Sequence, residues 1–168
     1  TEEFDQVLQR TVARKTLLDH VRGQPLMVCA FIREAQITSQ LDHPNIVPVH
    51  DLVLDAQGRL SFTMKRVVGR SLLEVLEEDA DGLFIDHAIE RLCQRVEILV
   101  KVCDALAFAH SRGVLHCDIK AQNIMVGDFG QVYLMDWGFA RLLPPRASGG
   151  APVRLSPSAP GLTQIEDP

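Results

Sequence analysis

The sequence lacks any long apolar run, any paired cysteine motif and any basic stripe. No hydrophobic stretch approaches the ~20 residues of a transmembrane helix, and we expect neither a membrane segment nor a signal peptide in this chain. A net charge of −5 without a basic cluster argues against a nucleic-acid partner. The four cysteines form no CxxC pair, and we expect reduced, mostly buried thiols in a cytoplasmic domain.

Glycine is scarce at the start of the chain, and proline is crowded at its end. The first glycine is Gly23. Six of the nine prolines lie between Pro144 and Pro168, mixed with Ser, Gly and Ala, and this composition predicts a loop or disorder over 143–168. Residue 1 is Thr instead of Met, so we expect this chain to be part of a longer protein.

The remaining sequence is typical of one globular domain that mixes strands and helices. Its 168 residues are 46% hydrophobic and 23% charged. Hydrophobic periodicity and turn residues predict strands over 11–18, 46–55 and 60–68, and helices over 26–41, 71–78 and 86–112. In the first strand, Ala13 and Lys15 share one face. In the first helix, an apolar stripe is flanked by Glu34.

The two later helices carry local signals of their own. Ser71 and Glu74 fit a capping box, and the acidic run over 77–81 is interpreted as a solvated loop. The longest helix has residues spaced four and three apart, which predicts one buried face with a core or boundary histidine at its end. These residues are Leu92, Val96, Leu99, Cys103, Leu106 and His110.

The segment 123–141, NIMVGDFGQVYLMDWGFAR, contains two Asp-aromatic-Gly triplets, which begin at Asp128 and Asp136. Two short apolar segments flank the turn residues 127–130 and predict a hairpin. Folding it places Asn123 near Asp136, with Asp128 at the tip about 15 to 17 Å away. Because Asn and Asp oxygens suit magnesium, Asn123 and Asp136 are the candidate pair of metal ligands.

Four motifs, well separated along the chain, occur in a fixed order. They are Val12-Ala13-Arg14-Lys15, Glu34, the run from His116-Cys117-Asp118 to Asn123, and Asp136-Trp137-Gly138. Together they resemble the V-A-I-K lysine, helix glutamate, H-R-D-L-x-x-x-N and D-F-G set of protein kinases, of the Ser/Thr type common in bacteria. The resemblance runs from residue 5 to about residue 142. It implies an α+β, protein-kinase-like fold, with ATP and Mg²⁺ as cofactors and a protein Ser/Thr hydroxyl as substrate.

The resemblance also implies a role for each polar residue. Lys15 would contact the α- and β-phosphates and be held by an ion pair with Glu34. Asp118 would orient the substrate hydroxyl and accept its proton, while Lys120 would neutralise charge on the transferred phosphoryl group. Asn123 and Asp136 would hold magnesium.

The same resemblance places the adenine pocket and divides the chain. Ala13 would lie over the base, Met64 would be the gatekeeper, and backbone groups from Lys65 to Val67 would form the hinge. A small-lobe segment would then span 1–68, the start of the large lobe 69–142, and an activation-segment tail 143–168.

Three departures from the family pattern carry consequences. Fourteen residues precede Lys15, too few for the glycine-rich loop, and no A-P-E motif follows Gly138. We therefore expect the isolated chain to be inactive while its parent protein is an active kinase. Cys117 replaces the Arg that receives an activation-loop phosphate, so basal activity should not need that phosphorylation. Cys117 itself is expected to be a small buried side chain, and Trp137 keeps a large apolar plug.

Two other functions remain open. A kinase-like nucleotide-binding or scaffold module would lack catalysis, although Lys15, Asp118, Asn123 and Asp136 are all present. A small-molecule phosphotransferase of the aminoglycoside type shares the fold. Those enzymes tend to carry His at the position of Lys120 and a residue other than Gly at the position of Gly138.

Overall fold

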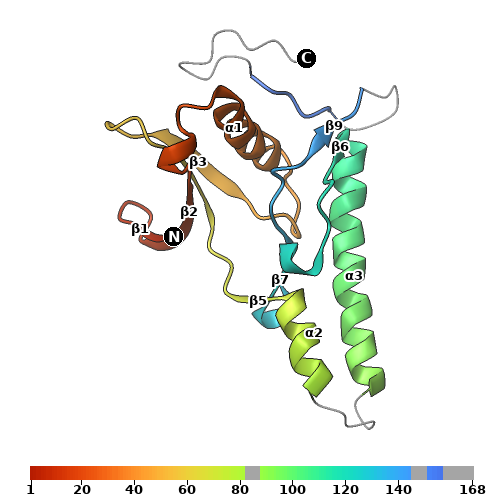
Figure 1. The fold of residues 1–168 in the computed structure, drawn as a ribbon. Coiled ribbons are helices and arrows are strands. Elements are labelled where there is room, and N and C mark those ends of the chain that lie inside the picture. The colour runs from red at the N-terminus through yellow and green to blue at the C-terminus, as the bar shows by residue number, and fades with distance from the viewer. Residues whose placement is uncertain (82–87, 145–150, 157–168) are drawn as a thin grey trace.

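The computed structural model describes residues 1–81, 88–144 and 151–156. It has an upper part built on a sheet and one helix, and a lower part built mainly on two helices (Figure 1). The upper elements are β1 (Glu2–Asp5), β2 (Arg10–Thr16), the 3₁₀ turn η1 (Asp19–Val21), α1 (Pro25–Ser39), β3 (Val49–Leu54) and β4 (Leu60–Lys65). The elements of the lower part are β5 (Gly69–Ser71), α2 (Leu72–Asp81), α3 (Ala88–Ser111), β6 (Val114–Leu115), η3 (Ala121–Asn123), β7 (Ile124–Gly127), η4 (Asp128–Gly130), β8 (Val132–Leu134) and β9 (Arg141–Leu142). Of these, α3 extends upward so that β6 and β9, at its upper end, lie at the height of α1 in Figure 1. The predicted α+β class is confirmed.

The upper sheet has the antiparallel order β1-β2-β4-β3. Ala13 and Lys15 lie opposite Met64 and Phe62, which puts all four side chains on one face. That face packs against α1, where the ring of Phe31 lies 5.1 Å from the ring of Phe62. The predicted alternation along β2 is confirmed, whereas β1 was not predicted.

A short connection after α1 attaches the sheet to the lower part. Asn45 donates from Nδ2 to the carbonyl of Val132 at 2.9 Å, and its own carbonyl accepts from Leu134 at 2.8 Å. Ile46 forms a parallel bridge to Leu134, and both side chains are fully buried. These contacts join the small sheet to β8, which leads directly into Asp136.

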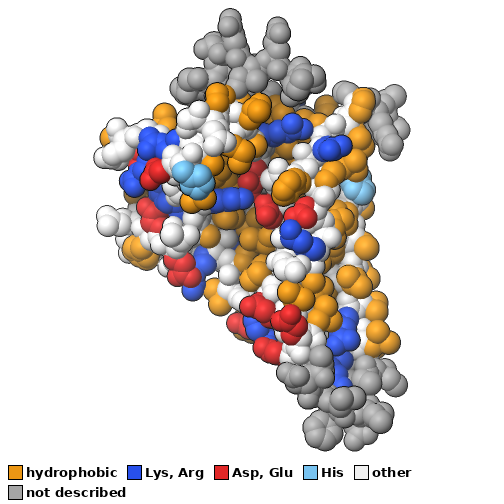
Figure 2. Space-filling model, in the orientation of Figure 1, with side chains coloured by type: hydrophobic (Ala, Val, Ile, Leu, Met, Phe, Trp, Pro, Cys, Tyr) orange, Lys and Arg blue, Asp and Glu red, His pale blue; other side chains and the backbone are white. Residues whose placement is uncertain are grey.

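The buried face of α3 is not the predicted one. Leu92, Val96 and Leu99 are at least half exposed, and Cys103 and His110 are exposed as well. The core is instead contacted by a face of smaller residues, Val102, Ala105 and Ala109. Small side chains let the helix approach β6 and β8 closely, so the packed face is turned by roughly a quarter of a helical turn. The exposed apolar side chains follow the outer edge of α3 in Figure 2.

At α2 one prediction is confirmed and one is wrong. Ser71 Oγ accepts from the Glu74 amide at 3.2 Å, and Glu74 accepts from the Ser71 amide at 2.6 Å, which is the predicted capping box. The acidic run 77–81, however, belongs to the helix and not to a loop.

The tail and the cysteines also depart from expectation. Residues 151–156 have no regular secondary structure, as predicted, yet Val153 is buried in the main core cluster. The other parts of the tail, 145–150 and 157–168, lie outside the described residues. All four cysteines are free, but Cys93, Cys103 and Cys117 are exposed and Cys29 is half-buried, so the prediction of buried thiols is wrong. Among the described residues no helix is both long and apolar enough to cross a membrane.

Candidate active site

Lys15 and Glu34 meet between the sheet and α1. Lys15 Nζ donates to Glu34 Oε1 at 2.6 Å and to Oε2 at 2.8 Å, which confirms the predicted ion pair. Glu34 is only 8% exposed. Burial raises the pKa of the Glu34 carboxyl, and the hydrogen bond from Lys15 opposes that rise. The ion pair with Lys15 thus keeps the Glu34 carboxylate in a buried position that disfavours its negative charge.

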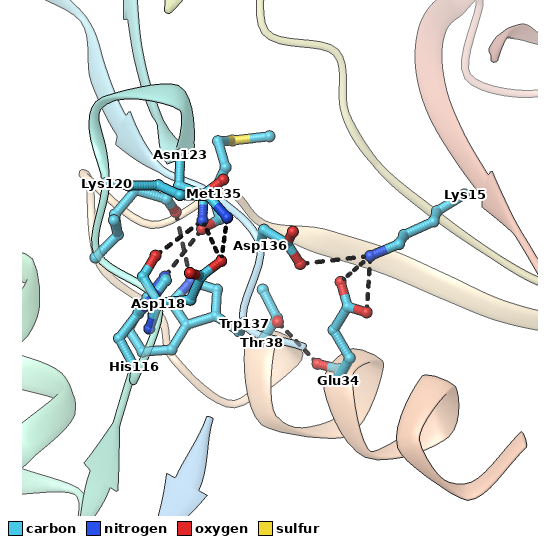
Figure 3. Close-up of polar contacts among 11 residues, drawn as sticks. Lys15, Glu34, Thr38, His116, Asp118, Lys120, Asn123, Met135, Asp136 and Trp137 are labelled. Atoms are coloured by element: carbon cyan, nitrogen blue, oxygen red, sulfur yellow. Dashed lines mark hydrogen bonds and ion pairs between the residues drawn. The ribbon is translucent and has the colours of Figure 1, made fainter. Parts of the chain in front are cut away.

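The hairpin of β7 and β8 separates the two aspartates of the Asp-aromatic-Gly triplets. Asp128 lies in η4 at the tip and is exposed, and the side chain of Phe129 beside it is fully exposed. Asp136 follows β8 at the other end, with Oδ1 3.6 Å from Lys15 Nζ (Figure 3). The Met135 amide donates to the Asn123 carbonyl at 2.8 Å, which closes this end of the hairpin. The predicted placement of Asp128 at the hairpin tip and of Asp136 at the opposite end, beside Asn123, is confirmed, and the role of Asp136 as a metal ligand stays a prediction.

Asp118, Lys120 and Asn123 form a second polar group. Lys120 Nζ donates to Asp118 Oδ2 at 2.6 Å. Asn123 Nδ2 donates to the Asp118 carbonyl at 2.9 Å and to Oδ2 at 3.0 Å. These bonds, led by that from Lys120, lower the pKa of the Asp118 carboxyl. Asp118 is therefore an ionised, acceptor-only group at neutral pH.

His116 joins the two groups, although the sequence analysis gave it no role. Its Nδ1 accepts from the Asp118 amide at 3.2 Å, so its Nε2 carries the hydrogen that bonds the Met135 carbonyl at 2.9 Å. Burial lowers the pKa of the His116 imidazole, which favours this neutral form. Trp137 packs edge-on against His116 at 4.6 Å and is 1% exposed. The predicted apolar plug at Trp137 is confirmed.

Backbone geometry near Asp136 imposes two further requirements. Asp136 has φ of 57°, a left-handed conformation that costs a residue with a side chain about 1 kcal/mol or more. A Cβ on Gly138 would lie 3.3 Å from both Asp136 Oδ1 and Glu34 Oε2. Gly138 therefore leaves room for two carboxylates, a role that only the three-dimensional arrangement reveals.

The residues predicted around adenine lie on β2 and at or just after the end of β4. Ala13 and Met64 are directly opposite in the β2–β4 register and share the face that carries Lys15. Lys65 lies on the opposite face, where its amino group bonds the hydroxyl of Tyr133. Within the described part of the chain, the backbone N–H and C=O of Val67 have no hydrogen-bond partner. They are available to a ligand, as the hinge prediction requires.

Comparisons with known proteins agree with this arrangement. The protein kinase domain family matches residues 4–156. The chain belongs to the protein kinase domain family. Among curated relatives, it is 32% identical over 144 residues to serine/threonine-protein kinase PknD of Protochlamydia amoebophila. It is 34% identical over 139 residues to serine/threonine-protein kinase PknD of Chlamydia muridarum. These alignments cover 83% and 81% of this chain but 15% of each relative's length.

In a protein kinase domain, the Lys15–Glu34 group and the Asp118–Lys120–Asn123 group belong to one site. On the face shown in Figure 2, acidic and basic side chains gather in the middle of the molecule, where the upper and lower parts meet. Lys15 and Glu34 come from the upper part, and Asp118, Lys120 and Asn123 come from the lower part. Asp136 lies between the two groups (Figure 3).

Proposed function

We propose that the protein containing this kinase domain transfers the γ-phosphoryl group of ATP to Ser or Thr hydroxyls of proteins. One observation carries the proposal: the cation of Lys15 contacts both Glu34 and Asp136, while Asp118 on the facing loop is bonded by Lys120 and Asn123. The same region therefore contains cations that can bind phosphate groups and carboxylates that can bind a metal ion or a substrate hydroxyl. Phosphoryl transfer requires little beyond such positioning and charge stabilisation.

Each residue has a defined task in this proposal. Lys15 binds the α- and β-phosphates, and Glu34 fixes the lysine's position. Asp118 accepts a hydrogen bond from the substrate hydroxyl and takes its proton as the new O–P bond forms and the bond from the γ-phosphorus to the bridging oxygen breaks, releasing ADP. Because its pKa is lowered, Asp118 is ionised and free to accept the hydrogen bond of the hydroxyl. Lys120 is then placed to stabilise the negative charge of the transferred group.

The donor set in the cleft fits magnesium. Asn123 uses its Nδ2 on Asp118, and within the described residues its Oδ1 accepts no hydrogen bond. Asp136 keeps 43% of its side chain exposed beside Lys15. No cluster of three or more His, Cys, Asp and Glu forms in the described part of the chain, so Asn123 and Asp136 would hold the ion together with phosphate oxygens and water. When bound, Mg²⁺ neutralises charge that develops on the phosphates.

The adenine of ATP is proposed to bind between Ala13, Met64 and the backbone from Lys65 to Val67. We propose the cytoplasm as the location, because ATP is supplied there and all four cysteines are free.

The test measures phosphate transfer from ATP to a generic Ser/Thr protein substrate, using the full-length protein. Asp118→Asn should lower kcat by about 100-fold or more. Asp136→Asn should abolish magnesium-dependent turnover, whereas the matched control Asp128→Asn should stay within about twofold of the unsubstituted protein. Equal loss in both Asp→Asn variants would contradict the assignment of the metal-holding aspartate.

Two outcomes would overturn the proposed reaction. Tight magnesium–ATP binding without any transfer would indicate a binding or scaffold module. Transfer to an aminoglycoside hydroxyl but not to protein would indicate a small-molecule phosphotransferase. Replacing Lys120 with His, the residue those enzymes tend to carry, should not improve protein phosphorylation.

A further inference from the structure

The described tail segment 151–156 runs along the end of α1 and is held there by a glutamine side chain. Gln40 Oε1 accepts from the Arg154 amide at 2.9 Å, and Gln40 Nε2 donates to the Arg154 carbonyl at 2.7 Å. The other hydrogen atom on Gln40 Nε2 is donated to the carbonyl of Gln36, at an N–O distance of 2.8 Å. A primary amide has two donors, and both are used here. Gln40 therefore pairs with Arg154 as a neighbouring strand would.

Residues on both sides of Arg154 also bond to the neighbouring helices. The Ser156 amide donates to Gln36 Oε1 at 3.3 Å, and the Val153 amide donates to the Arg112 carbonyl, just beyond α3, at 3.3 Å. The side chain of Val153 is 7% exposed and packs in the cluster that also contains Ile37. One short segment is thus bonded to the ends of both α1 and α3.

This contact lies on the same helix as Glu34. Gln36 and Gln40 follow Glu34 within two helical turns, so a displacement of this end of α1 moves the Glu34 carboxylate as well. The Lys15–Glu34 pair has Nζ–O distances of 2.6 and 2.8 Å, and a shift of the helix away from Lys15 by about 1 to 2 Å would lengthen them beyond hydrogen-bond range.

We propose that Gln40 is a positioning residue, which binds the main chain at Arg154 and thereby holds α1 and Glu34 in place for Lys15. The catalytic consequence of this inference rests on the proposed kinase function, but the structural contact does not. The hydrogen bonds reach the backbone of Arg154, so they need no particular side chain in the tail. The contact also needs no phosphate, and Cys117 offers no cation to bind one.

Hydrogen–deuterium exchange of the 168-residue chain tests the contact directly. Gln40→Met keeps the length of the side chain and removes its hydrogen bonds. Arg154→Pro removes the amide that Gln40 accepts from, whereas Arg154→Ala keeps it. Exchange over 31–39 should become roughly tenfold faster in Gln40→Met and in Arg154→Pro. It should stay within about twofold in Arg154→Ala and in Ser39→Ala, an exposed neighbour on α1.

The combined variant and a kinetic readout complete the test. Gln40→Met with Arg154→Pro should exchange no faster than either variant alone, because both remove the same contact. In the full-length protein, Gln40→Met should raise KM for ATP several-fold, with no further rise in a Glu34→Gln background. Unchanged exchange over 31–39 in folded Gln40→Met and Arg154→Pro would overturn the inference. So would an added KM effect in the Glu34→Gln background. Absence of any phosphotransfer by the unsubstituted protein would overturn only the proposed function, since the exchange result does not depend on ATP.

Discussion

At the scale of single residues, the site places ionisable groups where burial works against their charge. Glu34 is held ionised against desolvation by Lys15, and His116 is held neutral between two backbone groups. Burying such groups lowers the stability of the folded chain but fixes the positions of the side chains in the site. Substitutions here should therefore separate stability from activity.

Glu34→Gln should lower activity without lowering stability. Burial raises the pKa of Glu34, so the folded state binds a proton more readily than the unfolded state, and ionisation near neutral pH costs folding free energy. A neutral amide removes that cost, while the 38% exposed Lys15 can be solvated. Thermal unfolding at pH 7 should give a Tm equal to or above that of the unsubstituted chain. KM for ATP in the full-length protein should rise about tenfold or more. A Tm several degrees lower would contradict this account.

His116→Gln should flatten the acid dependence of stability. The pKa of His116 is lowered from 6.5, so below pH 6.5 the unfolded state binds a proton that the folded state resists. Stability from this group is fully present above pH 6.5 and is lost progressively as pH falls below 6.5 toward the lower pKa of the folded state. Tm measured from pH 7.5 to pH 5.5 should fall less steeply in His116→Gln than in the unsubstituted chain. Parallel curves would show that His116 is not a source of the acid sensitivity.

At the scale of elements, local signals determine where each one starts and ends. The capping box at Ser71 and Glu74 and the hairpin turn at 127–130 were both predicted from neighbouring residues, and both are present. The interactions involved span a few residues, so a sequence pattern is sufficient to indicate them.

Ser71→Ala should destabilise α2 by removing its N-cap. Two hydrogen bonds are lost: Ser71 Oγ accepts one from the Glu74 amide and donates one to Glu74 Oε2. The free energy of unfolding of the chain should decrease by about 1 kcal/mol in urea denaturation. Ser39→Ala is the matched control, because Ser39 lies at the exposed end of α1 and caps no helix start. Equal effects of the two substitutions would argue against the capping role.

The remaining parts of the fold and site could not be predicted because they depend on distant partners. The packed face of α3 is defined by Ala105 and Ala109, whose small size matters only once β8 is opposite them. The space kept by Gly138 between two carboxylates, and the bonds between Gln40 and Arg154, join segments far apart in the sequence. The resemblance to protein kinases, by contrast, implied the Lys15–Glu34 ion pair, and the hairpin pattern predicted that Asp136, and not Asp128, lies beside Asn123; both are present.

At the scale of the whole molecule, α3 carries an exposed apolar stripe among the residues that the structure describes. Leu92, Val96, Leu99 and Val100 are each at least half exposed along one side of the helix. Contiguous apolar surface of this kind promotes association in water.

Leu99→Lys should reduce self-association of the 168-residue chain. A charge in the middle of the stripe makes its burial against another molecule unfavourable. Sedimentation or light scattering over a range of concentrations should show a lower apparent mass for this variant. Leu54→Lys serves as the control, since Leu54 is similarly exposed but lies at the end of β3. Equal suppression by both substitutions would mean that added charge, and not the α3 stripe, is responsible.

The packing of Trp137 against His116 makes the chain its own optical reporter. Trp137 is the only tryptophan, and it lies buried one residue after Asp136 and edge-on to His116. Its fluorescence should therefore be blue-shifted in the closed site and should shift to the red when the segment around Asp136 swings out. Because a protonated imidazole quenches indole emission, the intensity should also fall as His116 takes up a proton. Movement of the site can thus be followed in solution without attaching a dye.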